Sequence, residues 1–269
     1  MVQIATKWST AQIYLYGAHV ARFKKHDEEP LLFLSERSSF EIGKPIRGGI
    51  PVIFPWFGQA QGKPGMHGWA RTTPWELAEI ASIPDGSVTL RFRLPEPNEC
   101  PACIVEYVVT IADSLGTQLN VTNRSAGHFE FEDCLHTYFG VGDIAAVSIA
   151  GLKGVDYLDK VEGFRRKTET NDAINIASEV DRIYVGAPQT VEIRDSSLKR
   201  IIRIAKENSA STVVWNPWIT KAKAMPDFGD EEYKQMVCVE SGNVSLDKIK
   251  LPPGETSRLK VEYSSASLK

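Results

Sequence analysis

The chain has 269 residues, of which 42% are hydrophobic and 9% aromatic, so it holds enough apolar material for a large core. Its formal net charge is −3 and charges of both signs are mixed along it, which argues against a surface for nucleic acid or an anionic membrane. The N-terminus lacks a basic segment followed by an apolar run, and no apolar stretch is long enough to span a bilayer. We therefore expect a cytoplasmic protein that binds neither nucleic acid nor membrane, and we expect a monomer.

Strand signals dominate the chain and recur at short spacing, separated by turns such as Pro84-Asp85-Gly86. They do not alternate with long amphipathic helices, which argues against a doubly wound α/β fold. We predict an all-β fold, a sandwich or barrel, that forms one domain over residues 1–269, with one or two short helices, for example near Asp230–Gln235. The candidate strands are Ile13–Phe23, Val88–Leu94, Cys103–Ala112, Gln118–Asn123, Phe129–Val141, Val191–Asp195, Ile201–Ala205, Thr212–Trp215, Met236–Glu240 and Ser257–Tyr263.

The stretch from Gly43 to Pro64 is rich in glycine, proline and bulky aromatic residues, and long ordered loops of this kind often form binding sites. Arg47 and Arg71 bracket it, with Lys63 and His67 between them. A guanidinium group binds phosphate or carboxylate through two parallel hydrogen bonds, so this loop is a candidate anion site. The alternative is that the arginines anchor the loop by salt bridges and that His67 binds backbone.

Four cysteines are present, and the spacing of Cys100 and Cys103 occurs in redox sites and in half of a zinc site. A redox pair needs a helix N-terminus, whereas this pair leads into a strand-like segment. A structural zinc site needs four ligands, and no second close pair exists. We therefore interpret the cysteines as reduced structural thiols.

Residues 129–139 alternate between an apolar face and a polar, aromatic face, as expected of a strand. The apolar face holds Phe129, Phe131, Leu135 and Phe139, and the other face holds Glu130, Glu132, Cys134, His136 and Tyr138. The second face suits the floor of a sugar site, and its carboxylates would favour a protonated His136 that donates a proton. The alternative, which this pattern supports equally, is a structural histidine bonded to Glu132 on an exposed face.

Two acidic residues follow later in the chain. Glu240 ends the apolar strand Met236–Glu240, where a carboxylate is either paired in a salt bridge or acts as a base. Asp181 begins a short strand and is either an acceptor for sugar hydroxyls or a turn residue. Taken alone, each segment favours the structural alternative. The aromatic turn Trp215–Trp218 is expected to serve packing.

Together these segments resemble the aldose 1-epimerase (mutarotase) superfamily, in particular its glucose-6-phosphate 1-epimerase branch. The resemblance runs through nearly the whole chain in the right order, and the ordered set is more specific than any one part. Its parts are Pro45-Ile46-Arg47-Gly48-Gly49-Ile50-Pro51, Phe54-Pro55-Trp56-Phe57-Gly58, His67-Gly68-Trp69-Ala70-Arg71, Leu135-His136-Thr137-Tyr138-Phe139, Asp181-Arg182-Ile183-Tyr184, Trp215-Asn216-Pro217-Trp218 and Cys238-Val239-Glu240.

The resemblance implies a large β-sandwich of the galactose mutarotase type that interconverts the α and β anomers of hexose 6-phosphates without a cofactor or metal. It implies that His136 is the general acid and Glu240 the general base. It also implies four substrate-binding residues, which are Arg47, His67, Arg71 and Asp181. Met66 stands where family members often carry a substrate-contacting glutamine, so the preferred sugar phosphate is open. The alternatives are a sugar or sugar-phosphate binding module without activity, and a mutarotase of unphosphorylated aldoses.

Overall fold

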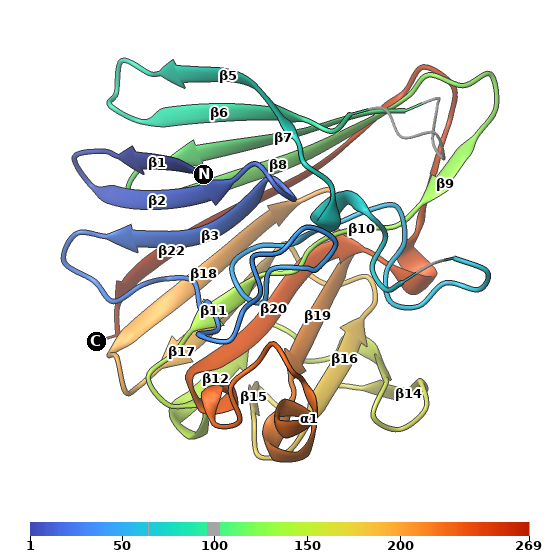
Figure 1. Cartoon of the computed structure of the whole chain (residues 1–269). Helices are drawn as coiled ribbons and strands as arrows, with labels where there is room; N and C mark the ends of the chain where they lie inside the picture. The colour runs from blue at the N-terminus through green and yellow to red at the C-terminus, as the bar shows by residue number, and fades with distance from the viewer. Residues whose placement is uncertain (64, 96–102, 269) are drawn as a thin grey trace.

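The computed structural model describes residues 1–63, 65–95 and 103–268, and two large antiparallel sheets form its two main layers (Figure 1). One sheet holds, in spatial order, β15 (Ala173–Asn175), β12 (Val147–Ala150), β17 (Thr190–Asp195), β18 (Arg200–Glu207), β22 (Thr256–Ser267), β8 (Leu115–Asn123), β7 (Cys103–Ile111), β6 (Val88–Arg93) and β5 (Glu76–Ser82). The other holds β14 (Arg165–Thr168), β13 (Asp156–Asp159), β16 (Val180–Tyr184), β19 (Ser211–Asn216), β20 (Met236–Asn243), β10 (Asp133–Leu135) and β4 (Val52–Ile53), and β11 (Tyr138–Gly140) also pairs with β20.

Smaller elements complete the fold. The N-terminal strands β1 (Val2–Ala5), β2 (Ser9–Tyr14) and β3 (His19–Lys25) form a three-stranded sheet, and β9 (Phe129–Phe131) pairs with β21 (Ile249–Leu251). The helical elements are α1 (Trp218–Ala224) and the 3-10 helices η1 (Ala70–Thr72), η2 (Ile144–Ala146), η3 (Glu232–Gln235) and η4 (Ser245–Asp247). Within the described residues, no helix has both the length and the apolar character needed to cross a membrane.

The main core lies between the two large sheets, since it contains Val237 and Val239 of β20 together with Ile202 of β18 and Leu119 of β8. In β7 and β8 every second side chain is buried, as expected of strands that cover a core with one face. In β19 and β20 every residue is buried. The side of β20 opposite the core is therefore covered as well, and this second face positions the site described below.

The second face of β20 packs against a separate apolar cluster. It brings together Phe33, Tyr138, Trp215, Ala222, Phe228, Tyr233, Met236 and Cys238. Ala222 belongs to α1, which lies beside one end of β19 and β20 (Figure 1). Loops and α1 thus lie around a cavity on this face of the sheet.

The all-β prediction is confirmed, but three predicted elements differ from the structure. The predicted strand Ile13–Phe23 is a hairpin, because the chain turns at Gly17, which has a φ of 74°. The predicted strand Phe129–Val141 is three short strands, of which β9 pairs with β21, whereas β10 and β11 both pair with β20. The helix expected near Asp230–Gln235 is the 3-10 helix η3, whereas the α-helix starts at Trp218, in the aromatic turn.

The cysteine motif can be described only in part, since Cys100 lies outside the described residues. Cys103 begins β7 and is buried. Cys134 and Cys238 are buried thiols on the face of the eight-stranded sheet that carries the site.

Candidate active site

A cavity of about 250 Å³ opens over β20 on the face opposite the main core. It is lined by Arg47, Phe57, Met66, His67, Arg71, His136, Tyr138, Lys160, Asp181, Trp215, Lys221, Met225 and Glu240. All six residues predicted for the site are in this set, although they come from segments nearly 200 residues apart. Lys63, the other predicted contributor of charge, lies instead near the ring of Trp56.

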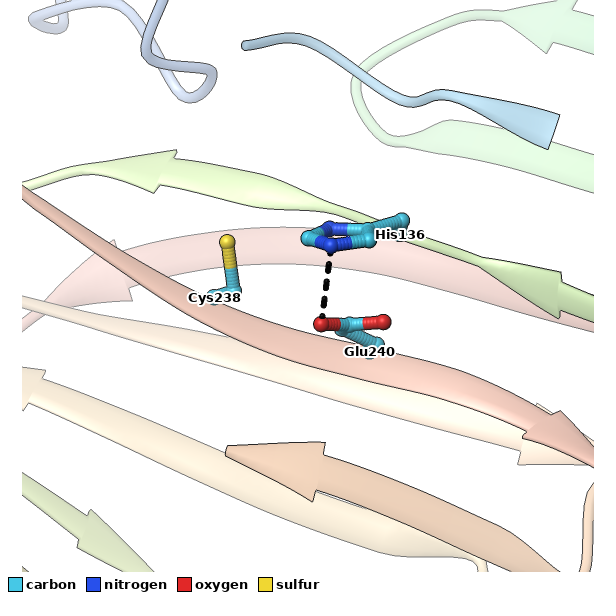
Figure 2. A group of neighbouring side chains, drawn as sticks. All are labelled: His136, Cys238 and Glu240. Carbon is cyan, nitrogen blue, oxygen red and sulfur yellow. Dashed lines mark ion pairs between the residues drawn. The ribbon is translucent and has the colours of Figure 1, made fainter. Parts of the chain in front are cut away.

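His136 and Glu240 meet at the floor of the cavity, with Nε2 of the imidazole 3.2 Å from Oε1 of the carboxylate (Figure 2). The register of the sheet produces this contact, because Leu135 pairs with Ser241 in antiparallel strands, and His136 follows Leu135 while Glu240 precedes Ser241. The chain leaves β10 directly after Leu135, and the backbone N–H of His136 donates to the carbonyl of Pro51 at 3.0 Å. Both side chains are buried.

Aromatic and thiol groups hold the pair in place. The His136 ring stacks on Tyr138, with centroids 4.8 Å apart and planes 11° apart, and it forms a T-shaped contact with Trp215. The thiol of Cys134 donates to Oε2 of Glu240 at 3.5 Å, so that the second carboxylate oxygen is held as well. The carboxylate is therefore fixed from both sides.

Burial opposes charge on both members of the pair. It raises the pKa of Glu240 well above its ordinary value of 4.5, and it lowers the pKa of His136 well below 6.5, with further lowering from His67 and Arg71. The prediction that neighbouring carboxylates favour protonated His136 is therefore wrong for the protein without substrate. Glu132 accepts from the backbone N–H of Phe57 at 2.9 Å, so it also does not cap His136.

Two arginines line the rim of the cavity and differ in how they are held. Arg47 donates through Nε and Nη2 to Asp227, at 3.2 and 3.0 Å, and through Nη1 to the hydroxyl of Tyr138 at 3.0 Å. Arg71 donates through Nη2 to the carbonyl of Met66 at 2.9 Å, and its Nε is buried without a hydrogen-bond partner in the described part of the chain. Burial lowers the pKa of Arg71 to about 10. Arg71 thus keeps one donor that no group of the described residues accepts from.

Asp181 on β16 lies across the cavity and is 3.0 Å from Nζ of Lys160 and 3.8 Å from Nζ of Lys221. It is the only one of the six predicted residues that is already paired with lysines. Sequence reasoning did not find Lys160, Lys221 or Asp227, because no motif separates them from the other charged residues of the chain. Only the fold brings them to the predicted site.

His67 sits in a backbone conformation that side chains rarely adopt, with a φ of 66°. Such a residue costs roughly 1–3 kcal/mol and often marks a functional position. Its Nδ1 accepts from the N–H of Gly58 at 3.2 Å, and burial lowers its pKa well below 6.5. The ring is therefore neutral, with the proton on Nε2, and can donate one hydrogen bond. Beside it, the Met66 side chain is half exposed at the rim.

Known proteins resemble this chain over most of its length. The family model described as "Aldose 1-epimerase" matches residues 1–264. A protein of Cenchrus ciliaris, provisionally named glucose-6-phosphate 1-epimerase, is 39% identical over 268 residues, which cover 95% of this chain and 81% of that protein. A protein of Escherichia coli K12 with the same provisional name is 37% identical over 238 residues, covering 87% of this chain and 80% of that one.

Solved structures show the same fold. A crystal structure of a mutarotase, also provisionally named, from Salmonella typhimurium superposes with a TM-score of 0.91 at 30% identity, covering 98% of this chain and 90% of that one. A galactose mutarotase related enzyme from Lactobacillus acidophilus superposes with a TM-score of 0.77 at 15% identity, covering 100% and 98%. The predicted β-sandwich of the galactose mutarotase type is thereby confirmed.

Proposed function

The chain belongs to the aldose 1-epimerase family, and we propose that it interconverts the α and β anomers of hexose 6-phosphates, with glucose 6-phosphate as the first candidate. The observation that carries the proposal is the buried contact of 3.2 Å between an imidazole and a carboxylate at the floor of a cavity rimmed by four cationic side chains. A mutarotase needs one acid and one base at the reacting atoms, and a phosphorylated sugar needs cations at a distance from them. The relatives that bear the name glucose-6-phosphate 1-epimerase support the same substrate class.

The reaction opens the pyranose ring, rotates the bond between C1 and C2, and closes the ring on the other face of the aldehyde. In our proposal Glu240 removes the proton of the O1 hydroxyl while His136 gives a proton to the ring oxygen O5. On closure the roles reverse, so both residues return to their starting state. Positioned acid–base groups each contribute about 10²–10⁴-fold in rate.

The proton of the pair must be on His136 when the ring opens, although burial disfavours that form in the free protein. We propose that binding of the substrate makes protonated His136 more favourable. Arg71 and Arg47 are among the groups that lower the pKa of His136. A phosphate dianion bound by these arginines would offset their charge and raise that pKa. The single proton could then pass across the 3.2 Å contact from Glu240 to His136.

The rim residues would hold the substrate. Arg71 would bind the phosphate through its unpartnered Nε, and Arg47 through the donors that Asp227 and Tyr138 leave free. Lys160 would approach the phosphate or a hydroxyl, and Asp181 would accept hydrogen bonds from sugar hydroxyls. Neutral His67 would donate one from Nε2.

The test is anomer exchange of glucose 6-phosphate, measured by saturation-transfer NMR with catalytic amounts of protein. We expect exchange well above the buffer rate, and no acceleration would overturn the proposal. Glucose and galactose in the same assay test the mutarotase of unphosphorylated aldoses, which would accelerate them as strongly. Tight binding of glucose 6-phosphate without exchange would instead indicate a binding module.

A further inference from the structure

Cys238 has no part in the proposed reaction, yet it lies directly beside the two residues that do. A ring nitrogen of His136, Sγ of Cys238 and a carboxylate oxygen of Glu240 all lie within 4.8 Å of one another (Figure 2). Cys238 and Glu240 are two residues apart on β20, so their side chains leave the same face of the strand. Cys238 is fully buried, and it is absent from the lining of the cavity.

These three atoms match the ligand preferences of zinc. Zinc binds imidazole nitrogen, thiolate sulfur and carboxylate oxygen at about 2.0, 2.3 and 2.0–2.2 Å, with tetrahedral geometry. Two ligands at 2.0 Å lie about 3.3 Å apart on such a tetrahedron. The imidazole and carboxylate of this pair are already 3.2 Å apart. The thiol lies within 4.8 Å of both atoms and must approach them to complete the third corner.

We propose that His136, Cys238 and Glu240 form a binding site for Zn²⁺, with the fourth ligand position facing the cavity. A thiolate and a carboxylate offset the charge of the ion, which permits its burial. Three protein ligands with one open position are the arrangement of zinc sites that bind an exchangeable ligand. Magnesium and calcium are excluded because they require six or more ligands, mainly oxygen.

Zinc at this site would inhibit the proposed reaction, because it occupies both the acid and the base. This consequence rests on the proposed function, whereas the binding does not. Zinc and the sugar phosphate would exclude each other, since the ion blocks the contact to which the sugar ring must bind. The inhibition should therefore be reversed by a chelator.

The binding experiment uses Co²⁺ as a spectroscopic substitute for Zn²⁺, without any sugar. We expect one equivalent of Co²⁺ to give tetrahedral absorption bands and a near-ultraviolet thiolate-to-cobalt band, and Zn²⁺ to remove both. Cys238→Ala should abolish the thiolate band, and Cys238→Ser serves the same purpose if the alanine variant does not fold. Cys103→Ala, which changes a buried cysteine on β7, is the matched control and should keep the band. A thiolate band that survives in the folded Cys238 variants, or no thiolate band in the wild type, would overturn the proposal.

The inhibition experiment measures anomer exchange with added Zn²⁺. We expect Cys238→Ala to keep its metal-free rate and to need at least about 10-fold more Zn²⁺ for half inhibition, since even outer partners of a metal site contribute 10–100-fold to affinity. Equal Zn²⁺ sensitivity in the variant and the wild type would contradict the site. If the protein has no exchange activity, the cobalt spectra still decide the binding claim, so the two proposals fail separately.

Discussion

The floor and the rim of the cavity are built differently. The floor pair, His136 and Glu240, follows from strand register, and β20 is buried along its whole length. The rim cations come from loops, from the 3-10 helix η1 and from α1, and three of them, Arg47, Lys160 and Lys221, are held by ion pairs with acidic residues. In our proposal, strand register fixes the acid and the base, whereas ion pairs hold cations that exchange partners when the phosphate binds.

The two regions also differ in the cost of charge. Burial raises the pKa of Glu240 and lowers that of His136, so the floor disfavours the state in which Glu240 is ionised and His136 is protonated. At the rim, Arg47 and Lys160 keep acidic partners. We infer that the rim cations select the phosphate, and that the bound phosphate raises the pKa of His136 at the floor. The following experiments test this division between rim and floor.

The largest effect is expected for Glu240→Gln, which keeps the shape of the floor and removes the base. Anomer exchange should fall about 10²–10⁴-fold, measured at saturating glucose 6-phosphate by saturation transfer. A near-normal rate in a folded variant would refute the assignment of Glu240.

The same variant should be more stable than the wild type above the ordinary pKa of Glu240. The folded protein raises that pKa, so the stability that protonated Glu240 contributes is present below pH 4.5 and is lost as pH rises through the folded value. Thermal unfolding should therefore show a Tm advantage of Glu240→Gln that grows from pH 5 to pH 8. A constant difference across this range would contradict the direction of the pKa shift.

Asp227→Asn weakens the ion pair that holds Arg47, at 3.0 Å, without touching the floor. We expect KM for glucose 6-phosphate to change by about 10-fold, the typical effect of a hydrogen bond between charged groups, while kcat changes less. A steady-state exchange assay measures both constants. A loss confined to kcat would indicate that Asp227 supports the floor instead of the rim.

Inorganic phosphate supplies the charge of the substrate separately from the sugar. If the anion raises the pKa of His136, phosphate should increase kcat for the exchange of neutral glucose several-fold before it competes with glucose 6-phosphate. Sodium chloride at equal ionic strength is the control. Inhibition by phosphate without any increase in kcat would show that the rim binds phosphate but does not raise the pKa of His136.

The smallest effect is expected for Cys134→Ala, which removes the hydrogen bond to Oε2 of Glu240. This bond lowers the pKa of Glu240, so its loss should raise that pKa further. The rate should be bell-shaped in pH, with an acid limb below 6.5 from His136 and an alkaline limb where the pair loses its last proton. In the variant the alkaline limb should move to higher pH, and the maximum should fall about 2- to 5-fold, as for one weak hydrogen bond. An unmoved alkaline limb would show that Cys134 does not position the base.

Much of the site could be predicted from the sequence, because ordered motifs name residues that strands then bring together. His136 and Glu240 carry such motifs, and so do Arg47 and Arg71. Strand alternation also placed Phe131, Leu135 and Phe139 correctly in the core. The breaks of that segment were not predictable, since they depend on which strands pair with it. The acidic residues that pair with the rim cations could not be predicted either, because an ion pair such as Arg47 with Asp227 joins residues 180 positions apart.

The most direct test of the division between floor and rim is Arg71→Met, with anomer exchange of glucose 6-phosphate and of glucose measured side by side. Arg71 binds the phosphate in our account, but its charge also lowers the pKa of His136 in the free protein. We therefore predict that kcat/KM for glucose 6-phosphate falls at least about 10-fold, the effect of one lost charge-assisted hydrogen bond, while the value for glucose stays the same or rises. An equal fall for both sugars would contradict the account.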